Sequence, residues 1–300
     1  MHSEPAYGPW TVTWRVHADP AMLVAGLRAL HLQALEPHAM LGVAQNSDYR
    51  EDPWGRLFRT IDYVATVTYG TRDEAEAIAA RVRRIHRALR GHDPYTGTEF
   101  RIDDPELLRW VHVAEIESYL TVTRRAGLRL SRAEADQYVK EQLWTAELVG
   151  LDPADVPGSV AEIMDYYERL RPRLRAIPEA KEALRFTIRP PMPRVVSLAT
   201  PARPAWAMTA FLGFALLPRW ARRLYGFWSP VTFDAAATAA VRALRRSMLT
   251  GVPRPLREGP YIRTARRRLD DRRAPRLTSP DAMRRLLGGR GKDLTHAGGM

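Results

Sequence analysis

The 300-residue sequence predicts an all-α protein, with a single multi-helix domain followed by an arginine-rich tail. Capping residues followed by apolar residues at helical spacing recur along most of the chain, whereas alternating strand patterns are scarce. Apolar residues make up 45% of the chain, which is enough to bury a substantial core. We place the helical domain at residues 1–250. Residues 251–300 are expected to be a basic, Pro- and Arg-rich tail, partly disordered or in short helices.

The first helices are defined by proline and glycine signals. An apolar stretch over residues 21–35 predicts a helix that Pro37 ends. Asp52 and Pro53 form an N-cap and first-turn pair for the next long helix, which Gly70 ends. The segment between these two helices is expected to be short.

The helix that follows carries the strongest signals in the chain. Thr71 is its expected N-cap, and Gly91 is expected to end it. Acidic residues in its first turn and arginines in its last turn suit the helix dipole. These residues are Asp73, Glu74 and Glu76 at the start and Arg84, Arg87 and Arg90 at the end.

Capping signals also mark the helices of the middle of the chain. Asp104 with the following proline opens a helix that ends at Gly127. Ser131 forms a capping box with Glu134 for a helix that continues to Gly150, and a Ser-x-x-Glu pattern recurs at Ser159.

The longest apolar run, residues 205–217, is too short to cross a bilayer. It covers about 13 residues, whereas a span needs roughly 18 to 20. We therefore expect a buried helix and no transmembrane span, with peripheral contact to a membrane surface left open. The last helix is expected over residues 230–249, after Ser229.

The chain contains no cysteine, so disulfides and thiolate ligands are excluded, and any metal must bind histidine, aspartate or glutamate. The sequence start lacks a basic segment followed by an apolar one, which leads us to expect a cytoplasmic protein. Most of the net charge of +12 comes from the tail. Arginines cluster there without interleaved aromatic residues or a recognised nucleic-acid motif, so nucleic acid is a disfavoured partner.

Two polar helix faces stand out as candidate sites. One carries Arg56, Arg59 and Thr60 at i, i+3 and i+4, and the other carries Arg83, His86 and Arg90. If the two helices fold back at Gly70, both faces lie at the same height, about 22 Å from the turn. On spacing alone, the favoured interpretation is that the arginines are surface residues and that His86 is a hydrogen-bonded core histidine or one that suits the helix dipole.

The sequence around these faces resembles the latex-clearing protein family of rubber oxygenases and MpaB-like oxygenases. The resemblance rests on R-L-F-R-T at residues 56–60, R-R-I-H-R-A-L-R at residues 83–90, G-L-R-A-L-H-L-Q-A-L at residues 26–35 and W-V-H at residues 110–112. These motifs follow in order, and the similarity covers roughly residues 8–250.

The resemblance implies a globin-like, haem b-dependent oxygenase that uses dioxygen to oxidise a hydrophobic small molecule. His86 would then be the iron ligand, with Arg83 and Arg90 near the haem propionates. Arg56 and Thr60 would lie on the opposite, dioxygen-binding side together with Arg59, a position at which rubber oxygenases carry lysine.

His112 is the further cofactor-site candidate. With Glu115 it has the i, i+3 spacing of a helical metal pair, but the paired Glu-x-x-His pattern of a di-iron bundle is missing. We expect His112 to line the cofactor pocket, or else to be a core histidine. A helical protein that binds a hydrophobic ligand without catalysis, and a tail that binds anionic nucleic acid or membrane, are the alternative functions. The oligomeric state stays open.

Overall fold

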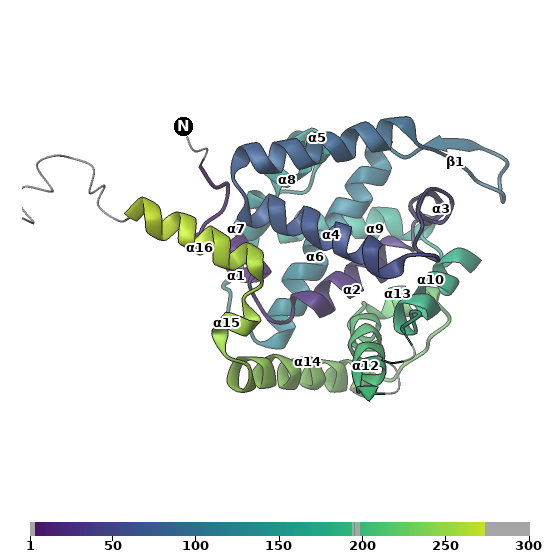
Figure 1. Ribbon diagram of the computed structural model, residues 1–300. Coiled ribbons are helices and arrows are strands. Elements are labelled where there is room, and N and C mark those ends of the chain that lie inside the picture. Colours follow the sequence, from purple (N-terminus) through teal and green to yellow (C-terminus); the bar gives the residue numbers. More distant parts are fainter. Residues whose placement is uncertain (1–3, 194, 196–198, 274–300) are drawn as a thin grey trace, which may run out of the picture.

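The computed structural model describes residues 4–193, 195 and 199–273, and it confirms the all-α class (Figure 1). Its first half contains α1 (Val12–His17), α2 (Met22–Gln33), α3 (Pro37–Asn46), α4 (Pro53–Tyr69), α5 (Arg72–Ala88), the strands β1 (Arg90–His92) and β2 (Glu99–Arg101), and α6 (Pro105–Ala126). Its second half contains α7 (Arg132–Glu141), α8 (Leu143–Val149), η1 (Pro153–Asp155), α9 (Val160–Leu170), η2 (Arg171–Arg173), α10 (Pro178–Ile188), α12 (Ala202–Ala215), α13 (Arg219–Leu224), α14 (Val231–Gly251), α15 (Arg254–Arg257) and α16 (Pro260–Arg273).

The expected caps are present at the helices that position the site. The carboxylate of Asp52 accepts a hydrogen bond from the amide of Gly55 at the start of α4, at 2.9 Å. Thr71 and Glu74 form a complete capping box at the start of α5. Gly127 ends α6 with a φ of 107°, a conformation that glycine adopts without strain.

Helix α5 ends earlier than its sequence predicted, and this corrects the expected face of Arg83, His86 and Arg90. Leu89 is extended, and Arg90 belongs to β1, which pairs antiparallel with β2. The close approach of Phe100 explains the change, because a side chain at Gly91 would collide with that ring. Asp93 then caps the hairpin turn by accepting from the amides of the following residues.

The helix expected over residues 131–150 is broken into α7 and α8 at Gln142. The break follows from contacts with α1: the Glu141 carboxylate accepts hydrogen bonds from the amides of Val12 and Thr13, at 3.3 and 2.7 Å. The Gln142 side chain donates to the Thr13 hydroxyl at 2.8 Å. Tertiary hydrogen bonds therefore override the local helix pattern.

The core is built around α6, which packs against α2, while α12 covers the other side of α2. Trp110 of α6 is fully buried and donates from its indole nitrogen to the carbonyl of Gln33 at 2.9 Å. Gly213 permits the close contact between α12 and α2, because a side chain there would lie 3.0 Å from the Arg28 amide. This frame leaves α5 along one edge of the molecule, with α4 next to it on the inner side, and α14 along the opposite edge (Figure 1).

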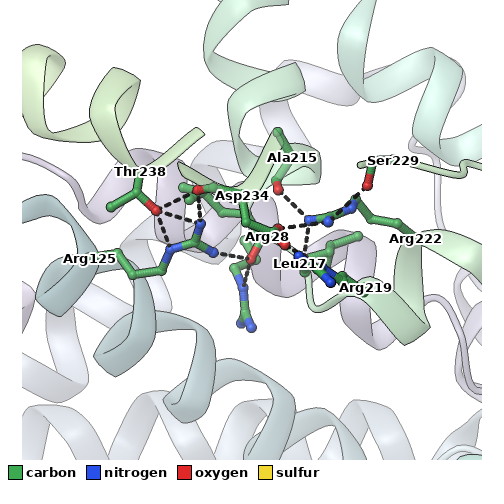
Figure 2. Close-up of polar contacts among 10 residues, drawn as sticks. Arg28, Arg125, Ala215, Leu217, Arg219, Arg222, Ser229, Asp234 and Thr238 are labelled. Atoms are coloured by element: carbon green, nitrogen blue, oxygen red, sulfur yellow. Dashed lines mark hydrogen bonds and ion pairs between the residues drawn. The ribbon is translucent and has the colours of Figure 1, made fainter. Parts of the chain in front are cut away.

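Three arginines donate to carbonyls at the carboxyl end of α12, and a fourth joins them through Asp234 (Figure 2). Arg28 and Arg125 donate to the Leu216 carbonyl at 3.1 and 3.2 Å. Arg222, which is fully buried, donates to the carbonyls of residues 215 and 217 and to Asp234. Arg219 also pairs with Asp234, at 2.6 Å. Cations suit this end of a helix because its last carbonyls carry partial negative charge.

The first part of the expected tail packs on the body. Ala265 of α16 is buried against Trp14 and Tyr69, and Arg268 pairs with both oxygens of Glu74 at 2.8 Å. The domain boundary at residue 250 stays a prediction, and residues 274–300 of the tail lie outside the described residues. Within the described chain, no helix is both long and apolar enough to cross a membrane.

Three buried histidines predict that acid destabilises the fold. Burial lowers the pKa of His17 and His31 to about 3 and that of His112 to about 4, so the unfolded chain binds their protons below pH 6.5 and the folded protein does not. Burial raises the pKa of Glu115 to about 7. Its contribution to the free energy of unfolding is therefore lost as the pH rises from 4.5 through 7, and this pH dependence cancels that of one histidine. The pH dependence of the other two histidines remains. The free energy of unfolding should therefore fall by about 3 kcal/mol per pH unit between pH 6 and pH 5.

Urea unfolding at pH 5, 6 and 7 measures this slope. His31→Phe provides the matched variant, because the new ring can pack against Phe214, whose centroid lies 6.2 Å from that of His31. The variant should show about half the wild-type slope. An unchanged slope would contradict the assignment of this pH dependence to the buried histidines.

Candidate functional site

The candidate site lies where the first half of α4 meets the second half of α5. The two helices pack as an antiparallel pair joined at Gly70 and Thr71, as expected. His86 and Arg56 come together across this pair, since the Arg56 guanidinium lies close enough to lower the pKa of His86. Asp103, just before α6, contributes the opposing charge.

The surroundings of His86 favour the neutral form of its imidazole. Burial lowers its pKa below the ordinary value, Arg56 lowers it further, and Asp103 only partly opposes these effects. The side chain is half-buried, and neither ring nitrogen has a hydrogen-bond partner among the described residues. A neutral imidazole with a free lone pair is the form that ligates iron.

Arg56 presents an unpaired positive charge next to this ring. Its side chain is half-buried, and within the described part of the chain it forms no ion pair and no side-chain hydrogen bond. Burial lowers its pKa, with Asp48 opposing and Arg59 adding to that shift. A partly desolvated guanidinium without a partner is poised to bind an anion or an oxygen that gains negative charge.

The other two candidates on α4 face solvent. Arg59 pairs with Asp48 at 2.7 Å and with Asp52 at 3.4 Å, and its side chain is 58% exposed. Thr60 is exposed, and its hydroxyl donates to the carbonyl of Arg56 at 3.1 Å. The structure therefore brings Arg56 and His86 together but does not bring Arg59 and Thr60 to them, and the roles expected for these two stay predictions.

Arg83 and Arg90 are held by backbone carbonyls. Arg83 donates to the Leu148 carbonyl near the end of α8. Arg90 is exposed on β1 and donates to the carbonyls of Arg87 and Leu89 at 2.7 and 2.8 Å. Each guanidinium keeps further N–H groups for another acceptor, so a role toward propionates stays a prediction.

A buried polar group on α6 faces the same helix pair. His112 is buried, and its Nε2 has no hydrogen-bond partner among the described residues. Glu115, one turn later, raises the pKa of Tyr63 on α4, while Arg83 of α5 lowers it. The face that His112 shares with Glu115 therefore points toward α4 and α5.

Sequence reasoning missed the parts played by Tyr63, Asp103 and Glu115. The Tyr63 hydroxyl is buried and has no partner in the described part of the chain, and Glu115 is hydrogen-bonded to Tyr119. Only the i, i+3 spacing of His112 and Glu115 offered a signal, and it was set aside because no second such pair exists. Unsatisfied buried polar atoms of this kind indicate that a ligand or ordered water completes the site.

Large apolar side chains near Arg56 and His86 are exposed. Phe58 and Ile61 of α4 are 62% and 41% exposed, and Ile85 of α5 is 47% exposed. These side chains leave apolar surface on two adjacent helices that is available to a ligand. In the described residues, no group of three or more histidine, aspartate or glutamate side chains is arranged to hold a metal ion by itself.

Comparison with known proteins places these observations in a family. No curated protein and no solved structure matches the chain. Residues 14–250 match the family described as ER-bound oxygenase mpaB/B'/Rubber oxygenase, catalytic domain. The match covers most of the chain and includes α4, α5 and α6, where Arg56, His86 and His112 lie. The chain therefore belongs to this family of oxygenases.

Proposed function

We propose that the protein is a haem b-dependent oxygenase in which His86 ligates the iron and dioxygen is used to oxidise a hydrophobic small molecule. The observation that carries the proposal is the neutral, unpartnered imidazole of His86 beside the unpaired guanidinium of Arg56. Membership of the oxygenase family supports it. When bound, haem supplies the iron chemistry that activates dioxygen.

The residues of the site fit this cofactor. A porphyrin provides four nitrogen ligands, so one neutral imidazole from the protein is sufficient. The exposed apolar side chains Phe58, Ile61 and Ile85 offer a surface that a flat macrocycle can cover. The unpaired Nε2 of His112 has the character of a polar atom that a bound group would satisfy.

Each protein group would then have a definite task. His86 would hold the cofactor, burial together with the charge of Arg56 favours its neutral imidazole, and the Arg56 guanidinium could donate to an oxygen that gains negative charge. We assign the free N–H groups of Arg83 and Arg90 to the propionates, and Arg59 and Thr60 to the outer rim on the dioxygen side. Glu115 can hold or release a proton near neutral pH because burial raises its pKa to about 7.

An absorbance spectrum with iron analysis tests the proposal directly. The purified protein, reconstituted with haem b, should show a Soret band and about one iron per chain. Dioxygen uptake is then measured with long-chain alkenes as hydrophobic probes. A protein that stays colourless after reconstitution would overturn the haem assignment.

Arg56→Ala should keep haem but bind anions poorly at the ferric iron. A hydrogen bond from a charged donor is worth about 1.5–3 kcal/mol, so fluoride should bind roughly tenfold to 100-fold more weakly. Fluoride titration followed by the visible spectrum measures this without knowledge of the substrate. Arg84→Ala removes an exposed charge from the neighbouring helix and serves as the control. Equal fluoride affinity in wild type and Arg56→Ala would exclude the proposed position of Arg56.

A further inference from the structure

A second site lies along α14, at the edge of the molecule opposite α5 (Figure 1). A groove of about 950 Å³ runs beside this helix. Its lining includes Val231, Ala235, Ala239 and Ala243, which follow one another along one face of α14. The volume is within the range of small-molecule sites, and the alanines leave an elongated apolar floor.

Arginines border this floor. Arg219, Arg242 and Arg246 line the groove, together with Arg125 from α6. Arg242 uses only its Nε, which donates to the Arg125 carbonyl at 3.0 Å, and within the described residues neither Arg242 nor Arg246 forms an ion pair. These two arginines are one helical turn apart, so their like charges repel each other unless an anion lies between them.

The charges behind the groove add to its positive potential (Figure 2). Asp234 is the only carboxylate in the lining, and it is already paired with Arg219 and Arg222. Burial is the main cause that lowers the pKa of Arg125, and nearby arginines and carboxylates act in opposite directions on it. The described lining of the groove holds four arginines and one carboxylate. A negative ligand would relieve this imbalance.

We infer that this groove binds the anionic head of an acyl-chain molecule, with the head at Arg242 and Arg246 and the chain along the alanine floor. An apolar floor without charges does not suit a small inorganic anion, and the bordering guanidinium groups do not suit a neutral lipid. The floor from Val231 to Ala243 extends over about 18 Å, which accommodates most of an extended long chain. The inference does not rest on the proposed haem chemistry, because none of the residues that line the groove belongs to the proposed haem site.

Oleate below its micelle concentration is the probe, and binding to the full-length protein is followed by calorimetry. Oleate should bind wild type and raise its melting temperature, and Arg242→Gln combined with Arg246→Gln should weaken binding roughly tenfold or more. Ala239→Trp keeps every charge, fills the floor and should also block binding. Arg132→Gln with Arg189→Gln removes two exposed arginines from α7 and the end of α10 and should bind oleate like wild type.

Two further binding experiments test whether the ligand needs a negative charge and whether it comes from a membrane. Oleyl alcohol has the same chain without the charge and should bind much more weakly than oleate. Vesicles that contain phosphatidylglycerol test whether the anionic head comes from a membrane instead, and binding to them with the same arginine dependence would support that source. The inference is overturned if oleate and the vesicles both fail to bind, if the alcohol binds as tightly as oleate, or if the groove variants bind like wild type.

Discussion

His86→Ala is expected to lose most of its bound haem b. The substitution removes the proposed bond between protein and iron and leaves only apolar contacts and propionate pairing to hold the cofactor. Loss of residues that merely orient a metal ligand costs 10-fold to 100-fold in affinity, so loss of the ligand itself should cost on the order of 100-fold or more. Titration with haem, followed at the Soret band, measures the change.

Two variants separate ligation from misfolding. His92→Ala alters an exposed histidine on β1 and should retain haem like wild type. His86→Gly leaves room for added imidazole, which should restore the Soret band if the ring acts as a ligand. Unchanged haem affinity in His86→Ala, with a wild-type helical spectrum, would exclude His86 as the ligand and leave the groove on α14 unaffected.

The sequence predicted the helices of the site because their signals are local. Asp52, Thr71 and Gly127 each act through hydrogen bonds or dihedral angles within a few residues, and all three mark helix ends in the structure. The equal height of Arg56 and His86 follows from helix rise and one turn. These features need no knowledge of distant contacts.

What the sequence missed depends on packing between distant segments. Helix α5 stops early because Phe100, from the second strand of a hairpin, lies against Gly91. Arg59 faces solvent because Asp48 and Asp52 hold it, and the charge of Glu115 on α6 acts on Tyr63 of α4, which is far from it in the sequence. No spacing within one helix reveals such contacts.

The burial of arginine side chains also depends on contacts that the sequence does not reveal. Arg28 belongs to a motif that supported the family resemblance, but its sequence context gives no sign that it is buried. In the structure it is 2% exposed, donates to both oxygens of Glu117 at 2.7 and 3.1 Å, and bonds to Ser118. It therefore joins α2, α6 and the end of α12 through one side chain.

Arg28→Met should destabilise the fold by about 3–5 kcal/mol, because it leaves the buried Glu117 carboxylate without its cation. Methionine preserves much of the side-chain volume, so the loss reports on charge and hydrogen bonding more than on a cavity. The free energy of unfolding in urea measures the effect. Arg173→Ala breaks an ion pair with Glu106 whose partners are 65% and 66% exposed, and it should cost less than about 1 kcal/mol.

The double variant Arg28→Met with Glu117→Leu tests the cause. If the unpaired carboxylate of Glu117 causes most of the loss in stability, removal of both partners should recover part of it, since apolar residues often replace a buried ion pair at little cost. The Leu216 carbonyl would still lose the hydrogen bond from Arg28, but Arg125 continues to donate to it at 3.2 Å. A double variant as unstable as the sum of the two single variants would instead mean that Arg28 acts mainly by holding the end of α12, where Arg125 and Arg222 also donate to backbone carbonyls.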